Sequence, residues 1–281
     1  MSGTATTKAR VRKIRGGRAE DVEDALAAEE PLEIRILERI DGDERAHAVT
    51  VTMRTPGHDR ELAAGFLFSE AVLRNREEIA SIEPGAPRAV EESGNVIEVR
   101  LRKGLTLDLS RAVRSFYTTS SCGVCGKTSL DALWARTPPP IPGGAPRVSA
   151  TTLAAMPETL RRAQAGFERT GGLHAAAVFR EDGRMLLVRE DVGRHNAVDK
   201  VVGERFLAGA LPLGDCALLV SGRASFEILQ KAVMAGIPFV AAVGAPSSLA
   251  VDVAREFGVT LVGFLHGDAF NVYAGVERVG E

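Results

Sequence analysis

The chain has 281 residues, of which 45% are hydrophobic, enough to bury the core of one large domain or two modest ones. A formal charge of -2 and 5% aromatic residues argue against nucleic-acid binding, which relies on excess Lys and Arg or on aromatic stacking. Three cysteines in a chain of this length make no disulfide framework, so we expect a protein of the reducing cytoplasm.

The N-terminal segment, residues 1–21, is predicted to be a disordered basic tail. No apolar segment follows its cations, so it does not look like a secretory signal, and a transit peptide is the less favoured alternative. The cations are Lys8, Arg10, Arg12, Lys13, Arg15 and Arg18. The chain also lacks any run of about 18 uncharged apolar residues, so we expect no membrane-spanning helix and no membrane partner.

Residues 22–115 are predicted to form a small α+β domain. A helix is expected over 60–73, capped by His58 or Asp59. The Asp41-Gly42 pair indicates a hairpin between the first two strands. Alternating apolar residues or strand-like composition indicate the strands, at 31–40, 47–56, 95–101 and 106–110.

Residues 116–281 are predicted to form a larger α/β domain. The last four strands are mostly apolar and alternate with helices, which indicates a largely parallel sheet buried on both faces. The expected strands are 174–180, 184–191, 216–222, 238–244 and 260–265. The expected helices are one around 130–134 and others at 156–167, 196–207, 225–236 and 248–258, with Pro157 in the first turn of its helix.

The stretch "TTSSCGVCGKTS" (118–129) contains two thiols, Cys122 and Cys125. Its glycines favour turns, and the following helix N-terminus and Lys127 would lower the thiol pKa and raise the nucleophilic thiolate fraction. The pair by itself permits zinc binding, disulfide exchange or sulfur carriage. A structural zinc site needs four ligands and no second CxxC is present, although Cys216, a distant histidine or a second copy could complete one. A thioredoxin-like motif would open an early βαβ unit, whereas this one follows about 115 residues of other structure.

Polar segments follow three of the expected strands. They are "REDVGRHNAVDK" (189–200), "SGRASFE" (221–227) and "VGAPSSLA" (243–250). Carboxyl ends of parallel strands share one edge of a sheet, and helix N-termini there favour anions, so together the segments suggest a phosphorylated ligand. The alternative for "REDVGRHNAVDK" is a solvated turn with ordinary helix capping. His195 by itself is as easily structural as functional. His174, which follows "TGGL" in another strand, is expected at a core or edge position rather than in catalysis.

With these segments identified, the chain resembles the formate dehydrogenase accessory sulfurtransferases of the FdhD type. The resemblance runs in order over roughly residues 30–273, and a run as long as "REDVGRHNAVDK" makes it specific. The segments that carry it are "PLEIRI", "MRTPGHDRELAAGF", "TSSCGVCGK", "TGGLHAAAVF", "REDVGRHNAVDKVVG", "SGRASFEILQKA", "AGIPFVAAVGAPSSLAV" and "NVY".

The resemblance implies that the protein is an enzyme, namely a sulfurtransferase that takes persulfide sulfur from a cysteine desulfurase. Cys122 would carry the sulfur, and Cys125 would assist transfer or protect the loop. The acceptor would be the molybdenum bis-guanine-dinucleotide cofactor, needed for formate dehydrogenase activity, with no cofactor or metal permanently bound. The implied fold is a cytidine-deaminase-like three-layer α/β/α domain with a smaller α+β domain, in a homodimer.

The residues that the resemblance and the strand ends together assign to cofactor binding are Arg194, His195, Ser221, Arg223, Phe264, Leu265, His266, Gly267, Asp268 and Ala269. One departs from the family pattern: His266 stands where an arginine is usual, and its charge depends on pH.

A zinc deaminase is rejected, because Ser121 rather than proline precedes the CxxC and no H-x-E or C-x-E lies upstream. The alternative to the enzyme is a non-catalytic chaperone that binds the cofactor and delivers it to formate dehydrogenase.

Overall fold

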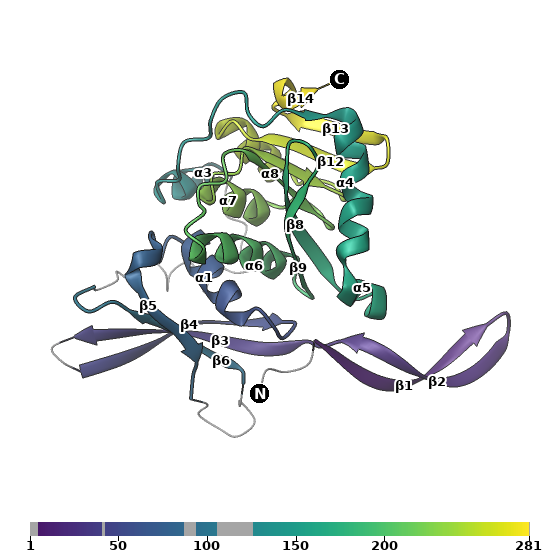
Figure 1. Cartoon of the computed structure of the whole chain (residues 1–281), viewed down its shortest axis with the longest axis horizontal. Helices are drawn as coiled ribbons and strands as arrows, with labels where there is room; N and C mark the ends of the chain where they lie inside the picture. Colours follow the sequence, from purple (N-terminus) through teal and green to yellow (C-terminus); the bar gives the residue numbers. More distant parts are fainter. Residues whose placement is uncertain (1–4, 41–42, 87–93, 106–125, 281) are drawn as a thin grey trace.

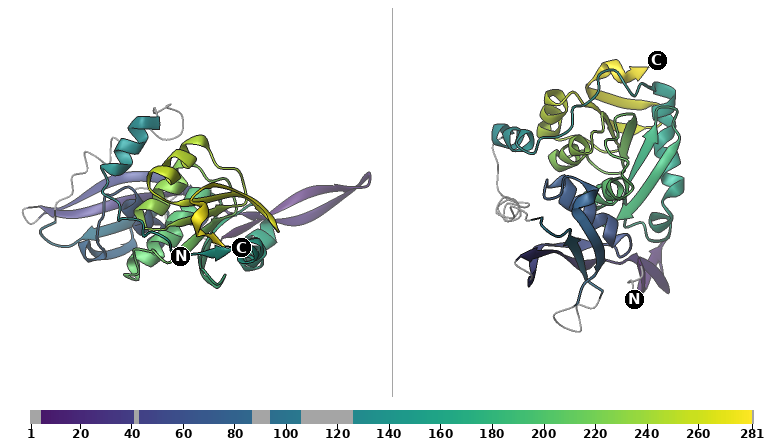
Figure 2. Two further views of the ribbon diagram at one scale, coloured as in Figure 1. Left: turned by 90° about the horizontal axis from the view of Figure 1, so that it is seen from above. Right: turned by 60° about the vertical axis from the view of Figure 1, so that its left-hand side comes forward.

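The structure is a computed structural model that describes residues 5–40, 43–86, 94–105 and 126–280. These residues build a six-stranded sheet and a four-stranded sheet, with helix α1 (Asp59–Ser69) between them (Figure 1; Figure 2). The domain boundary expected near residue 115 and the strand expected at 106–110 lie outside the described residues. Within the described ranges, no helix is long and apolar enough to cross a membrane.

The N-terminal segment is a β-hairpin, so the prediction of a disordered tail over residues 1–21 is wrong from residue 6 onward. Strand β1 (Thr6–Arg15) pairs antiparallel with β2 (Arg18–Ala27) along its whole length. Cross-strand charge pairs favour this register, because the cations of β1 lie opposite the carboxylates of β2. Lys8 Nζ lies 2.6 Å from Glu23 Oε1, and Arg12 Nε lies 2.9 Å from Asp21 Oδ1.

The four-stranded sheet has the order β4-β3-β6-β5, formed by β3 (Glu30–Ile40), β4 (Asp43–Arg54), β5 (Ile79–Pro84) and β6 (Val96–Leu101). Strands β3 and β4 form the predicted hairpin, and β3 runs parallel to β6. A short 3-10 helix, η1 (Arg76–Glu78), precedes β5. One face of the sheet supplies apolar residues such as Ile34, Ile36 and Val99 to the core against α1.

The six-stranded sheet has the order β13-β12-β11-β10-β8-β9, and only its three central strands are parallel. Those three are β10 (Cys216–Val220), β11 (Phe239–Ala242) and β12 (Thr260–His266). Strands β8 (His174–Arg180) and β9 (Met185–Asp191) are antiparallel neighbours, because the turn between them is too short for a crossover. Strand β13 (Ala269–Ala274) was not predicted; a turn at Gly267 returns the chain beside β12.

Helices cover both faces of this sheet, which gives three layers (Figure 1). One face carries α4 (Ala150–Ala163) and α5 (Ala165–Thr170); the other carries α6 (Arg194–Leu207), α7 (Phe226–Met234) and α8 (Ser248–Glu256). Pro157 lies inside α4 rather than in its first turn. The helix starts earlier because Ser149 caps it, accepting a hydrogen bond from the backbone N–H of Thr152.

Two short strands, β7 (Val148–Ser149) and β14 (Val279–Gly280), pair parallel, and a 3-10 helix, η3 (Val276–Arg278), precedes β14. Helix α3 (Gly126–Trp134) contains the helix predicted around 130–134 but begins earlier, directly after Cys125 and within the 118–129 segment, and it ends before the proline-rich residues 137–146. Trp134 fastens it to α8: its ring centroid lies 4.3 Å from that of Phe257, and its Nε1 donates to Glu256 Oε1 at 3.0 Å.

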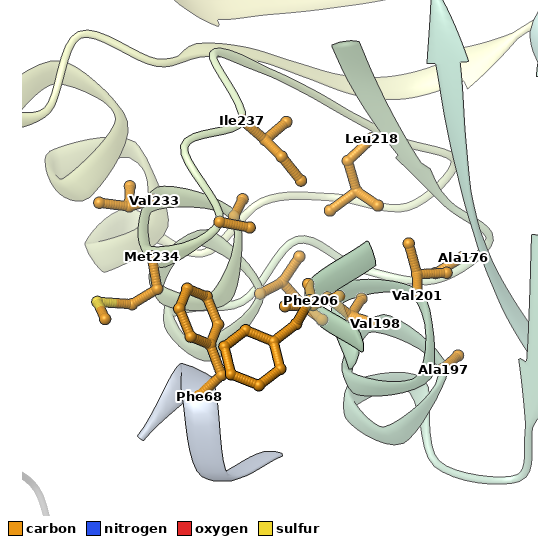
Figure 3. Packing of buried hydrophobic residues seen from close by; sticks show 14 of the residues in the cluster. Phe68, Ala176, Ala197, Val198, Val201, Phe206, Leu218, Val233, Met234 and Ile237 are labelled. Carbon is orange, nitrogen blue, oxygen red and sulfur yellow. The ribbon is translucent and has the colours of Figure 1, made fainter. Parts of the chain in front are cut away.

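Helices α1 and α6 cross in direct backbone contact and join the two sheets into one body. A Cβ on Gly65 would collide with the carbonyl oxygen of Asp199, and one on Gly203 would collide with that of Glu61. Further along the same two helices, the rings of Phe68 and Phe206 pack with centroids 5.0 Å apart (Figure 3). Only glycine permits so close an approach of two helices.

Candidate functional site

The three polar strand-end segments lie at one edge of the six-stranded sheet, as predicted. The backbone N–H of Gly244, after β11, donates to the Gly222 carbonyl, after β10, at 2.9 Å. The N–H of Phe264 in β12 donates to the Gly244 carbonyl at 3.1 Å. Strand β9 ends at the same edge because β8 runs antiparallel to both β9 and β10. The expected gathering of strand ends is therefore confirmed.

A cleft of about 750 Å³ opens between this edge and the α4–α5 layer. The strand-end wall consists of His174, Ser221, Val243, His266 and Gly267. The helical wall includes Arg161, Gln164 and Phe167, and the guanidinium of Arg161 lies 4.7 Å from the centroid of the Phe167 ring. The cleft thus combines an apolar wall with a cation, two imidazoles and the carboxylate of Glu158, which is itself paired with Arg162, and this suits a ligand with both planar and anionic parts.

At the cleft, His174 and His195 lie near the cation Arg194 and are neutral at pH 7. Burial, followed by the nearby Arg194, lowers the pKa of His195 to about 4 and also lowers the pKa of His174. His195 Nε2 lies 3.1 Å from Ser225 Oγ. The buried Nε of Arg194 has no hydrogen-bond partner among the described residues. At neutral pH the positive charge here therefore belongs to the arginine, and the imidazoles offer hydrogen bonds.

The residues assigned to cofactor binding occupy four different environments. Ser221, His266 and Gly267 line the cleft, and Ser221 Oγ accepts a hydrogen bond from the Ala175 N–H at 2.9 Å. Arg194 and His195 lie beside it at the start of α6. Leu265 is fully buried among core residues of the α4 face, so its side chain is not available to a ligand in this structure. The exposed residues are Arg223, Phe264, Asp268 and Ala269.

Residues that reasoning from the sequence underrated also reach the cleft. His174, expected at a core or edge position, lines it, together with Gly171 and Gly172. Because β8 is antiparallel to β10, its first residue lies at the carboxyl end of β10. The signal was "TGG" directly before a strand, but its use required knowing that β8 runs antiparallel.

Most of "REDVGRHNAVDK" faces the small sheet, while Arg194 and His195 lie beside the cleft, so the segment is not a solvated turn and only part of it could bind a ligand. Asp191, Asn196, Asp199 and Lys200 are all buried. Lys200 Nζ lies 2.7 Å from Asp191 Oδ2 and donates to the Thr55 carbonyl at 2.9 Å.

Residues of "MRTPGHDRELAAGF" (53–66) contact "REDVGRHNAVDK" from the side of the small sheet. The N–H of Thr55 donates to Asp191 Oδ2 at 3.2 Å, and Asn196 Nδ2 donates to the Met53 carbonyl at 2.7 Å. His58 stands at the N-cap of α1 with φ 60°, but its side chain makes no capping bond and instead lies 3.3 Å from Glu61. These two segments therefore form a polar interface between the sheets.

Charged pairs run through this interface. Burial raises the pKa of Asp199 to about 6, opposed by Lys231, whose Nζ lies 2.8 Å away. Glu61 is paired with Arg189 at 2.5 Å. Burial acts to raise the pKa of Glu61, but hydrogen bonds from Arg189 and His58 lower this pKa to about 2. In this interface, the Asp199 carboxylate is paired with Lys231 and the Glu61 carboxylate with Arg189.

The two thiols predicted to carry chemistry, Cys122 and Cys125, lie outside the described residues. The third cysteine, Cys216, is buried at the start of β10, and burial raises its pKa, which disfavours the thiolate. Within the described part of the chain, no group of three or more His, Cys, Asp or Glu residues could hold a metal ion.

Comparisons with known proteins agree with this arrangement. The model of the FdhD/NarQ family matches residues 27–280. Two relatives named "Sulfur carrier protein FdhD", from Streptomyces avermitilis and Mycobacterium tuberculosis, are each 52% identical. The alignments cover 99% of this chain, with 96% of the Streptomyces protein and 99% of the Mycobacterium protein.

A crystal structure from Desulfotalea psychrophila, whose description proposes a formate dehydrogenase accessory protein, shares the fold. It superposes with a TM-score of 0.73 at 23% identity and covers 98% of this chain and 99% of its own. The 52% identity to the relatives over nearly the full length and the family match over residues 27–280 point to the same family. This chain belongs to the FdhD/NarQ family.

Proposed function

We propose that this protein is a sulfurtransferase that carries sulfur as a persulfide on Cys122. It would take the sulfur from a cysteine desulfurase and pass it to the molybdenum bis-guanine-dinucleotide cofactor that serves formate dehydrogenase. The observation that carries the proposal is that relatives 52% identical over nearly the whole chain are named sulfur carriers. The CxxC segment supplies thiols suited to that role, with Lys127 and a helix N-terminus beside them.

The chemistry needs two thiols. The Cys122 thiolate attacks the outer sulfur of the donor's persulfide, and the donor's cysteine leaves as a thiolate. Cys125 then attacks the inner sulfur of the Cys122 persulfide, forms a disulfide and releases the outer sulfur as hydrosulfide to the metal. A cellular dithiol reductant restores both thiols.

The cleft supports the acceptor side of the proposal. A guanine could stack in a pocket walled by Phe167 and Arg161, and phosphates would meet Arg194 and the hydroxyl of Ser221. His266 would donate a hydrogen bond where the family usually has an arginine. The cofactor is cargo here and is not a resident group.

The setting follows from the same proposal. We expect a cytoplasmic homodimer with a cytidine-deaminase-like larger domain, and no bound zinc. The six-stranded sheet and the helices on its two faces form three layers, which is compatible with a cytidine-deaminase-like domain.

A cofactor-delivering chaperone is the second candidate, favoured by one observation. The described residues that line the cleft offer a cation, imidazoles and a hydroxyl that would bind a ligand without any sulfur chemistry. The two functions therefore differ only in what happens at Cys122.

Mass spectrometry after incubation with cysteine and a desulfurase separates them. We expect a mass increase of about 32 Da, one sulfur atom, on the wild type. Cys122→Ala should lose the adduct, whereas Cys216→Ala, which removes the buried third thiol, should keep it. Equal labelling of Cys122→Ala and wild type contradicts the carrier assignment, and no labelling of either favours the chaperone. Near-stoichiometric zinc that is lost in Cys125→Ala would overturn the carrier model.

A further inference from the structure

The β1–β2 hairpin, residues 6–27, is here called the arm. It projects beyond the rest of the molecule and continues the line of the four-stranded sheet (Figure 1; Figure 2). The family model begins only at residue 27, yet the relatives at 52% identity align with 99% of this chain. The arm thus lies before the family model but within the part of the chain that aligns with those relatives and, over 98% of this chain, with the Desulfotalea structure.

The arm has little core of its own. All residues from Arg12 to Asp21 are exposed, and the Val11–Val22 cross-strand pair is only half-buried. At its base, Ala27 packs beside Gly172. A two-stranded hairpin is marginally stable in water, so the projecting part needs a further surface to hold it in place.

Charge is divided across the width of the arm. Strand β1 has only cations among its charged residues: Lys8, Arg10, Arg12, Lys13 and Arg15. The charges of β2 are acidic apart from Arg18 at its start: Glu20, Asp21, Glu23 and Asp24. A nucleic acid or an anionic membrane would meet these carboxylates as well as the cations, which disfavours both as partners.

We propose that the arm binds the arm of a second copy of this chain. A two-fold axis that runs parallel to the long axis of the arm and beside one of its faces lays the basic strand of each copy over the acidic strand of the other. Each cation of β1 then meets carboxylates from its own arm and from the partner arm. The charge pattern is therefore complementary to itself.

Exposed apolar side chains on the arm and on the adjoining sheet are consistent with a protein partner. Ile14 is 70% exposed and Leu26 42%, both in the arm. Val51 is 63% and Met53 47% exposed on β4, in the sheet that the arm extends. Large exposed apolar residues on adjoining elements mark interaction surfaces. This inference rests on the homodimer proposed above and names the surface that forms it.

A charge-swapped arm tests the proposal. The variant combines Lys8→Glu, Arg10→Glu, Arg12→Asp, Asp21→Arg and Glu23→Lys, so the ion pairs within the arm persist with reversed sign and Arg10, the cross-strand partner of Glu23, does not face a new cation. We expect the wild type and the variant each to form homodimers in sedimentation velocity. In native mass spectrometry of a mixture, mixed dimers should be at least about tenfold rarer than the statistical proportion, because like charges then face each other.

A matched control swaps the exposed Glu158–Arg162 pair of α4, by Glu158→Arg with Arg162→Glu, and should mix freely with the wild type. Removing residues 1–27 should give a monomer that still unfolds cooperatively. Free mixing of the arm variant, or a dimer without the arm, overturns the arm contact. A monomeric wild type overturns the dimer as well, while persulfide labelling of Cys122 tests the sulfur-carrier function separately.

Discussion

The polar segment after β9 and the polar residues at the ends of β10 and β12 look alike in the sequence but have different roles. The first is buried and holds the two sheets together through Asp191, Asn196 and Lys200. The others border an open cleft with Ser221 and His266. Polar residues at a strand end therefore mark a ligand site only where no other part of the chain covers them, and β9 lies at the sheet edge nearest the small sheet.

The buried Lys200–Asp191 pair should show the largest effect on stability. Lys200→Met removes the cation and leaves Asp191 charged and buried, so we expect a loss of about 3–5 kcal/mol in the free energy of unfolding. Urea denaturation measures it. Lys103→Met, at an exposed position, is the control and should change stability by less than about 0.5 kcal/mol. A small effect of Lys200→Met would break the distinction between the two regions.

The helix crossing comes next. Gly65→Ala places a methyl group against the Asp199 backbone, so α1 and α6 must separate, at a cost of about 2–3 kcal/mol. Gly143→Ala, where a Cβ meets nothing within 4 Å, is the matched control. The comparison would fail if both variants unfolded at the same urea concentration as the wild type.

The Glu61–Arg189 pair gives the interface a pH dependence. The folded pKa of Glu61 is lowered to about 2 from 4.5, so its stabilisation is present above about pH 4.5 and is lost as pH falls toward 2. Glu61→Gln should therefore cost about 1–2 kcal/mol at pH 7 and progressively less at acid pH. Denaturation at several pH values checks this, with Glu158→Gln in an exposed pair as the control. A pH-independent difference would refute the assignment.

The cleft should show the smallest effect on stability but a clear one on binding. His266 is exposed, so His266→Ala and His266→Arg should each change the free energy of unfolding by less than about 0.5 kcal/mol. Affinity for GDP, measured by calorimetry, should fall about threefold to tenfold in the alanine variant and rise in the arginine variant. Arg45→Ala, on β4, is the control. Unchanged affinity in both variants would remove His266 from the proposed site.

Local patterns in the sequence predicted much of the secondary structure. The β3–β4 hairpin, the central parallel strands and helices α6, α7 and α8 follow from alternation, turn residues and helical spacing, which act over a few residues. The gathering of strand ends at one edge also followed, because parallel strands impose it. The family resemblance was visible in the same segments.

Contacts between distant residues explain the errors. The tail was taken as disordered because the cations of β1 were considered without the carboxylates of β2. Strand β13 was missed because its pairing with β12 follows an unremarkable turn at Gly267.

By itself, the sequence determined the local elements, the presence of two thiols at CxxC spacing and the family to which the chain belongs. Only the tertiary structure decided which polar residues are buried and which border the cleft. Burial depends on what packs against a side chain from far along the chain, as Thr55 does on Asp191. No local pattern of residues contains that information.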